Sequence, residues 1–362
     1  MTSWPDRRVL DLLHIDVPII QAPMAGVVST AMAVAVARAG GLASLPCALL
    51  RPDQVRQEVE TFRRGTNNPI NLNFFCHDAP TTDAGRYHAW QQCLAPYYAE
   101  LGLDLESSVP ANTIDPFGAA HCALVEELKP DVVSFHFGLP TQHLVDRVKA
   151  TGARVLSSAT TVEEAIWLKE HGCDAIIAQG LEAGGHRGMF LSSDVATQLG
   201  MLALLPQVAD AIELPVIAAG GIADARGIVA AFALGASAVQ IGTAYLFCPE
   251  ATVSRTHRQA LDGARSDQTV ITSVFSGRPA RVISNRIVCD LGPLPAGVPP
   301  FPLAGAAVAP LRAQAEPTGS ADFTPLWSGQ AARLGRLLSA GDLTRRLAQE
   351  TLAKLAAGLT RT

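Results

Sequence analysis

The stretch DAIIAQGLEAGGHRG, residues 174–188, joins a short apolar run to a glycine-rich loop that contains one histidine. The apolar run has the composition of a strand buried on both faces, as in a parallel sheet. Gly184 and Gly185 have no side chains, so the loop backbone can approach a ligand closely. His186 adds a group whose ordinary pKa lies near neutrality. The stretch therefore predicts a buried strand that ends in a functional loop.

Strand-like and helix-like segments alternate on both sides of this stretch. Apolar runs predict strands at 17–21, 42–45, 70–75, 132–137, 154–157, 175–178, 216–219 and 238–241. Helical spacing predicts helices at 30–39, 53–62, 117–128, 162–170, 198–211 and 225–234. Such alternation builds a parallel sheet through right-handed crossovers. Eight units favour a closed α/β fold, the (β/α)8 TIM barrel, over an open doubly wound sheet.

Two regions interrupt the alternation: an inserted segment after the third strand, and a C-terminal cap region. We expect the barrel at 1–75 and 116–258, and a substrate-covering cap region at 76–115 and 259–362. The insertion holds three of the four tyrosines. Because it follows the carboxyl end of a strand, we expect it to lie over the barrel mouth. Near the C-terminus, 292–302 reads as irregular, and 327–339 and 343–359 as helical. Alternatively, the tail only covers a barrel face or forms an oligomer contact.

Composition limits the classes of function. The 362 residues are 48% hydrophobic and 17% charged, with a net charge of −5, which predicts a globular protein without a basic field for nucleic acid. Seven cysteines, an odd number without a Cys-x-x-Cys pair, indicate reduced thiols and a cytoplasmic location. No His/Asp/Glu cluster has metal-ligand spacing. We expect no signal peptide and no membrane span.

Glycine turns follow the last two predicted strands. Gly220 and Gly221 follow the seventh strand, and Gly242 and Thr243 follow the eighth. Backbone N–H groups there can form an anion pocket, at the place where barrels of this kind often hold a phosphate. A phosphorylated cofactor across the barrel top is indicated, with flavin mononucleotide (FMN) as the natural candidate. Asn73 and Gln179 could bond the flavin or, as the commoner alternative, cap strand ends.

Five motifs resemble the nitronate monooxygenase family, formerly called 2-nitropropane dioxygenases. They are QAPMAG at 21–26, INLNFF at 70–75, QGLEAGGHRG at 179–188, AAGGIAD at 218–224 and QIGTAYL at 240–246. The match covers roughly residues 15 to 250. SFHFGLP at 134–140 and NFFCH at 73–77 look more like the class that oxidises propionate 3-nitronate (class I) than like the quinone reductase class.

The resemblance implies non-covalently bound FMN and an active-site histidine, His186. Matched by position, the implied FMN contacts are Ala22, Pro23, Met24, Asn73, Gln179, Gly184, Gly221, Gln240, Ile241, Gly242 and Thr243. We add Gly185 and Gly220 to the expected FMN contacts because they belong to the glycine turns. His136 and His77, at the ends of the fourth and third strands, are candidates for the substrate pocket, against the alternative of interior histidines.

The reaction implied is the oxidation of alkyl nitronates by O2 to a carbonyl compound and nitrite, through a flavin semiquinone. The cofactor supplies the redox chemistry, and the protein supplies position and electrostatics. His186 would orient the nitro group, stabilise its charge when protonated, or abstract the α-proton of a neutral nitroalkane. Glu182 would order the loop, and Arg187 would attract an anionic substrate or face solvent.

Two other functions use the same barrel. One is an NAD(P)H-dependent quinone or enoyl-thioester reductase, which keeps the flavin and changes the reaction. The other is a flavin-binding barrel without turnover, which serves as a carrier. The expected partners are a small nitronate and O2, with no nucleic acid and no membrane, and the oligomeric state is left open. An apolar, aromatic lid would admit small alkyl nitronates, and a basic group there would favour a carboxylated one.

Overall fold

Eight parallel strands form a barrel in the computed structural model, which describes residues 3–80, 83–105, 114–263 and 268–358. The strands are β1 (Ile19–Gln21), β2 (Ala43–Pro46), β3 (Ile70–Phe75), β4 (Val132–His136), β5 (Arg154–Ala159), β6 (Ala175–Gln179), β8 (Val216–Ala219) and β9 (Ala238–Ile241). They pair in the order β1-β9-β8-β6-β5-β4-β3-β2, and a parallel bridge between Ile20 and Leu42 closes the ring. The (β/α)8 prediction is confirmed.

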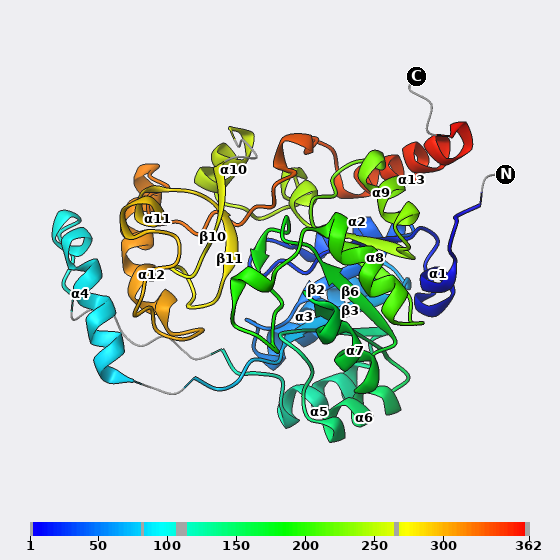
Figure 1. The fold of residues 1–362 in the computed structure, drawn as a ribbon, viewed down its shortest axis with the longest axis horizontal. Helices are drawn as coiled ribbons and strands as arrows, with labels where there is room; N and C mark the ends of the chain where they lie inside the picture. Colours follow the sequence, from blue (N-terminus) through cyan, green and yellow to red (C-terminus); the bar gives the residue numbers. More distant parts are fainter. Residues whose placement is uncertain (1–2, 81–82, 106–113, 264–267, 359–362) are drawn as a thin grey trace.

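Helices surround the barrel on its outer side (Figure 1). They are α2 (Thr30–Arg38), α3 (Pro52–Gly65), α5 (Ala119–Leu128), α6 (Gln142–Ala150), α7 (Val162–Glu170), α8 (Met201–Ala211) and α9 (Ala225–Ala233), with the short α1 (Arg8–Leu13) before β1. Each of these barrel helices buries apolar side chains, such as Val55, Val59 and Phe62 of α3. Helix α6 has no counterpart among the predicted helices, and the six helices predicted between the barrel strands all form.

A second, smaller unit lies beside the barrel (Figure 1). It contains β10 (Thr269–Thr272), β11 (Ala280–Ile283), α4 (Ala84–Glu100), α10 (Arg255–Asp262), α11 (Arg286–Leu291) and α12 (Ala304–Ala315). Trp90, Leu94 and Tyr98 of α4 belong to its apolar core, with residues of α11 and α12. Helix α4 therefore packs on α12 and contributes no lining residue to the cavity at the barrel mouth. Of the described part of the insertion, Ile114 reaches that cavity.

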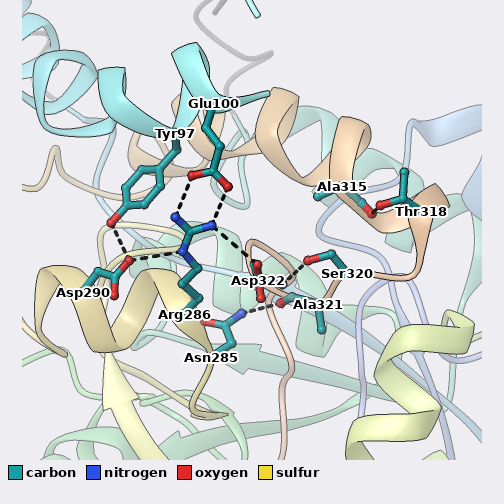
Figure 2. Close-up of polar contacts among 10 residues, drawn as sticks. All are labelled: Tyr97, Glu100, Asn285, Arg286, Asp290, Ala315, Thr318, Ser320, Ala321 and Asp322. Atoms are coloured by element: carbon teal, nitrogen blue, oxygen red, sulfur yellow. Dashed lines mark hydrogen bonds and ion pairs between the residues drawn. The ribbon is translucent and has the colours of Figure 1, made fainter. Parts of the chain in front are cut away.

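Arg286 fastens α4 to this unit (Figure 2). Its guanidinium donates two hydrogen bonds of 2.7 Å to the carboxylate of Glu100 on α4. It also pairs with Asp290 on its own helix, and the Tyr97 hydroxyl donates to Asp290. These ion pairs are partly exposed to solvent, so the buried aromatic side chains of α4 carry most of the attachment.

The C-terminal part of the chain returns to the barrel. Helix α13 (Ala340–Ala357) packs against α2 and α9, and the Tyr245 hydroxyl bonds the Thr344 hydroxyl at 2.8 Å. The predicted helix at 327–339 is wrong: apart from a short 3-10 turn, Ala332–Leu334, this segment is irregular. Within it, the Gln330 N–H donates to the Glu182 carbonyl of the glycine loop. Among the described residues, no helix combines the length and apolar character needed to cross a bilayer.

Candidate active site

A cavity of about 410 Å³ opens at the carboxyl ends of the barrel strands. This volume lies in the range of small-molecule and cofactor sites. The predicted site residues that line it are Ala22, Pro23, Met24, Asn73, His136, Gln179, Gly184, Gly185, His186, Gly220, Gly221, Gln240, Gly242 and Thr243. Side chains from the second unit close its other side. Motifs that are far apart in sequence therefore meet around one space.

Two predicted residues do not line this cavity. Ile241 is buried, and its carbonyl accepts the Ala22 N–H at 2.8 Å, which fixes the backbone beneath the site. His77 lies behind Phe301, with ring centroids 4.8 Å apart, and its Nε2 bonds the Ile114 carbonyl. Both residues therefore shape the wall from behind.

The loop after β6 is held by the side chain of Gln179. Its amide nitrogen donates to the His186 carbonyl at 2.9 Å, and its amide oxygen accepts the Gly188 N–H at 2.8 Å. Residues Gly185–His186 form the short strand β7, which pairs with β11 of the second unit. Gly185 has a φ of +73°, a conformation that favours glycine. Gln179 thus closes the loop on itself while lining the cavity.

Arg187 neither faces solvent nor reaches the cavity, which corrects both expectations for this residue. It is fully buried and donates to the carbonyls of Gln179 and Gly180 at 2.7 Å and to the Gln198 side-chain oxygen at 2.9 Å. Burial lowers the pKa of its guanidinium to about 10, so it stays charged at neutral pH. The buried charge of Arg187 is compensated by these oxygen atoms, and its hydrogen bonds fix the backbone where the loop after β6 begins.

Glu182 supports the same loop, as predicted. Both of its carboxylate oxygens accept the Met201 N–H at the start of α8, at 3.0 and 2.8 Å. An acidic group at a helix N-terminus is favoured by the exposed N–H groups there. The backbone carbonyl of Glu182 accepts the Gln330 N–H from the C-terminal segment.

The C-terminal segment lies directly on Gly184. A β-carbon at this position would be 2.5 Å from the Gly329 nitrogen and 2.6 Å from the Ser328 carbonyl carbon, so only glycine allows the approach. The Gly329 N–H donates to the Thr243 hydroxyl at 2.9 Å. Glycine is therefore required at position 184 because the C-terminal segment of the same chain packs against it. We call residues 328–330 the C-terminal strap.

The end of the cavity near β8 and β9 contains two glycine turns and one unpaired polar group. Gly220 and Gly221 have φ values of +110° and +70°, which turn the backbone sharply after β8. The side-chain oxygen of Gln240 is buried and has no hydrogen-bond partner among the described residues. Because buried acceptors are nearly always paired, this oxygen calls for a donor from a ligand. These residues fit the polar groups of FMN.

The other end of the cavity is aromatic and centres on His186. Its ring lies 5.4 Å from both Phe301 and Trp327 and 6.3 Å from Phe75, between centroids, and its Nε2 is 2.8 Å from the Ser276 hydroxyl. Burial, with His136 and Arg278 nearby, lowers the pKa of His186 to about 3. The imidazole is therefore neutral at physiological pH.

His136, at the end of β4, supports His186. Its Nδ1 bonds the Ser158 hydroxyl at 3.0 Å, and its Nε2 bonds the His186 carbonyl at 3.2 Å. Burial lowers the pKa of His136 to about 4, so it also stays neutral. Arg278 stacks its guanidinium on Phe137, 4.0 Å from the ring centre, and donates to the Met189 carbonyl. Its charge reaches this end of the cavity although its side chain does not line it.

Several lining residues could not be identified from the sequence. Phe275, Ser276, Phe301, Trp327 and Gly329 all come from the C-terminal third of the chain. Trp327 is also fixed through its carbonyl, which bonds His257 at 3.0 Å. The segment SVFSGRPAR at 273–281, rich in small and basic residues, is the one signal that could have pointed to Ser276.

Comparison with known proteins agrees with the motifs. The sequence profile described as "Nitronate monooxygenase" matches residues 7–350. Proteins named nitronate monooxygenase from Paraburkholderia phytofirmans and Pseudomonas aeruginosa are each 42% identical to this chain over 95% of its length, and the matches cover 94% and 98% of those proteins.

A solved structure supports the same assignment. The nitroalkane oxidase from Streptomyces ansochromogenes superposes with a TM-score of 0.88 at 37% identity, over 97% of this chain and 99% of that one. The resemblance predicted from five motifs thus extends beyond the barrel to the C-terminal unit. The chain belongs to the nitronate monooxygenase family and is an oxidoreductase.

Proposed function

We propose that this protein binds FMN non-covalently and oxidises alkyl nitronates with O2 to a carbonyl compound and nitrite. The observation that carries the proposal is the division of one cavity into two ends. One end offers glycine turns and the unpaired Gln240 oxygen, and the other offers a neutral histidine among aromatic rings. The first end suits a polar cofactor, and the second suits a small organic substrate.

The chain's own residues would divide the binding of FMN. Backbone N–H groups of Gly220, Gly221 and Gly242 would face the phosphate, with Thr243 beside them. The Thr243 oxygen already accepts the Gly329 N–H, which leaves its hydroxyl hydrogen to donate. Gln240 would accept a hydrogen bond from the cofactor. FMN, when bound, supplies the electron acceptor for the nitronate and passes electrons on to O2.

The histidine end would hold the nitronate. Among the described residues no lysine or arginine lines the cavity, and the aromatic rings exclude water from the nitro group. The positive charge of Arg278 behind Phe137 favours an anion at this end. We therefore propose that propionate 3-nitronate is accepted together with simple alkyl nitronates. The buried cysteines fit a reducing, cytoplasmic setting.

Anaerobic mixing of the flavin-loaded protein with its candidate reductants tests the function. Propionate 3-nitronate and an alkyl nitronate are expected to bleach the flavin rapidly, whereas NADH and NADPH leave it oxidised. Bleaching by a pyridine nucleotide alone would instead identify a reductase. A purified protein that is colourless and cannot be reconstituted with FMN would overturn the proposal altogether.

Replacing Gly184 with Ala is expected to weaken FMN binding at least about tenfold without unfolding the barrel. The new β-carbon would overlap the Gly329 and Ser328 backbone, so the C-terminal strap must move off Thr243. Fluorescence titration of the deflavinated variant with FMN measures the loss. Gly118→Ala is the matched control, since its β-carbon would meet nothing nearer than 3.7 Å. Wild-type affinity in Gly184→Ala would show that the strap does not hold this wall.

A further inference from the structure

Ser276 connects the ring of His186 to the backbone of the next residues. Its hydroxyl oxygen lies 2.8 Å from His186 Nε2 and donates to the Arg278 carbonyl at 3.3 Å. The same oxygen accepts the Arg278 N–H at 3.4 Å. Ser276 is only 8% exposed, so water does not replace these partners freely. The hydroxyl therefore sits in a fixed chain of hydrogen bonds.

Which group donates and which accepts in this series of hydrogen bonds depends on the number of available hydrogens. A serine hydroxyl has one hydrogen to donate, and a neutral imidazole carries one N–H. If the Ser276 hydrogen pointed at His186, the Arg278 carbonyl would lose its donor. If His186 Nε2 carries the hydrogen, the imidazole donates to Ser276 and Ser276 donates to the carbonyl. The second arrangement satisfies all three groups.

The opposite edge of the imidazole is then an acceptor. His186 lines the cavity, and its Nδ1 has no hydrogen-bond partner in the part of the chain that the structure describes. His136 and Gln179 bond the backbone carbonyl of His186 and leave its ring free to meet a ligand. Burial and the charge of Arg278 keep the ring neutral, which preserves the lone pair on Nδ1.

We propose that Ser276 is a positioning residue that holds His186 as the Nε2–H tautomer and so presents Nδ1 to the substrate as a proton acceptor. With a neutral nitroalkane, Nδ1 takes the α-proton, the C–H bond breaks, and its electron pair moves onto the nitro group. The products are an imidazolium and a nitronate, so charge is conserved. Ser276 accepts the Nε2–H before and after the transfer. This inference rests on the proposed function for the subsequent oxidation of the nitronate.

Nitrogen NMR on the flavin-loaded protein, labelled with 15N-histidine, tests the tautomer directly. The protein has nine histidines, and the His186→Asn variant identifies the signals of His186. We expect a protonated Nε2 and an unprotonated Nδ1 in the native protein, and a mixture of tautomers in Ser276→Ala. A protonated Nδ1 in the native protein, or an unchanged tautomer in Ser276→Ala, would overturn the proposal. This readout does not depend on turnover.

Kinetics separate positioning from a general structural role. Ser276→Ala should lower kcat/KM for a neutral nitroalkane at least about tenfold. For a preformed nitronate it should change kcat/KM less than about threefold, because no proton is removed from carbon. Ser276→Thr should restore the nitroalkane reaction, and Ser273→Ala, in the same segment but without a bond to His186, should behave as the native protein.

The two proposals fail in different ways. An equal loss for both substrates in Ser276→Ala would reduce Ser276 to a structural residue and overturn the positioning role. A native protein that reacts with neither substrate, yet shows the Nε2–H tautomer, would overturn the proposed function and leave the role of Ser276 in fixing the ring intact.

Discussion

Replacing His186 with Asn is expected to lower kcat/KM for a neutral nitroalkane about 100-fold while FMN remains bound. The free Nδ1 of the imidazole is the proposed proton acceptor at the aromatic end of the cavity, and losing a positioned general base costs about 10²–10⁴-fold. The residues proposed to hold FMN lie at the other end. Steady-state kinetics with a neutral nitroalkane measure the loss of turnover, and a flavin absorption spectrum measures the bound FMN. For a preformed nitronate the loss should be smaller, because no proton is removed from carbon.

A matched histidine outside the site provides the control. His14 is exposed and has a left-handed backbone conformation (φ +54°), which Asn tolerates. His14→Asn should therefore retain native turnover and native flavin content. If His186→Asn turned over the neutral nitroalkane at the native rate, the role assigned to His186 would be wrong. If it lost FMN instead, the division of the cavity into two ends would be wrong.

Replacing Arg187 with Met is expected to destabilise the protein by about 3 kcal/mol or more. The change leaves the Gln179 and Gly180 carbonyls and the Gln198 side-chain oxygen without their charged donor, at about 1–3 kcal/mol for each buried acceptor. Because the loop after β6 carries His186, activity should fall together with stability. Urea unfolding monitored by circular dichroism measures the change in the free energy of unfolding.

Two further variants calibrate this result. Arg187→Lys keeps the charge but cannot reproduce the geometry of three separate donors, so it should lose an intermediate amount. Arg346→Met removes an exposed arginine paired with Glu350 and should change stability by less than about 0.5 kcal/mol. Native stability of Arg187→Met would mean that the loop does not depend on the buried cation.

The barrel could be predicted because its strands are buried on both faces and therefore read as continuous apolar runs. The predicted strands at 70–75, 216–219 and 238–241 match β3, β8 and β9 residue for residue. Helix α12 could not be found in the same way: it contains Pro310, and it follows a proline-rich segment that reads as irregular. Its alanines become a buried face only when α4 packs against them.

The site was predictable where a motif follows a strand and unpredictable where two distant segments meet. Glycine turns after β6, β8 and β9 indicate a close approach in their own sequence. Ser276 and Trp327 reach His186 because β11 pairs with β7, a pairing that no local pattern contains. The expectations for Arg187 were wrong for a related reason. An arginine in a glycine-rich loop is usually solvated, and only the fold supplies the carbonyls that bury it.

The C-terminal strap has a consequence for the order of events during synthesis. The barrel strands leave the ribosome before residues 328–330, yet Gly329 and Gln330 complete the wall at Gly184 and Thr243. A nascent chain that ends before the strap would hold a barrel whose cofactor wall is still open. Stable capture of the proposed cofactor is then expected only after the strap has been synthesised.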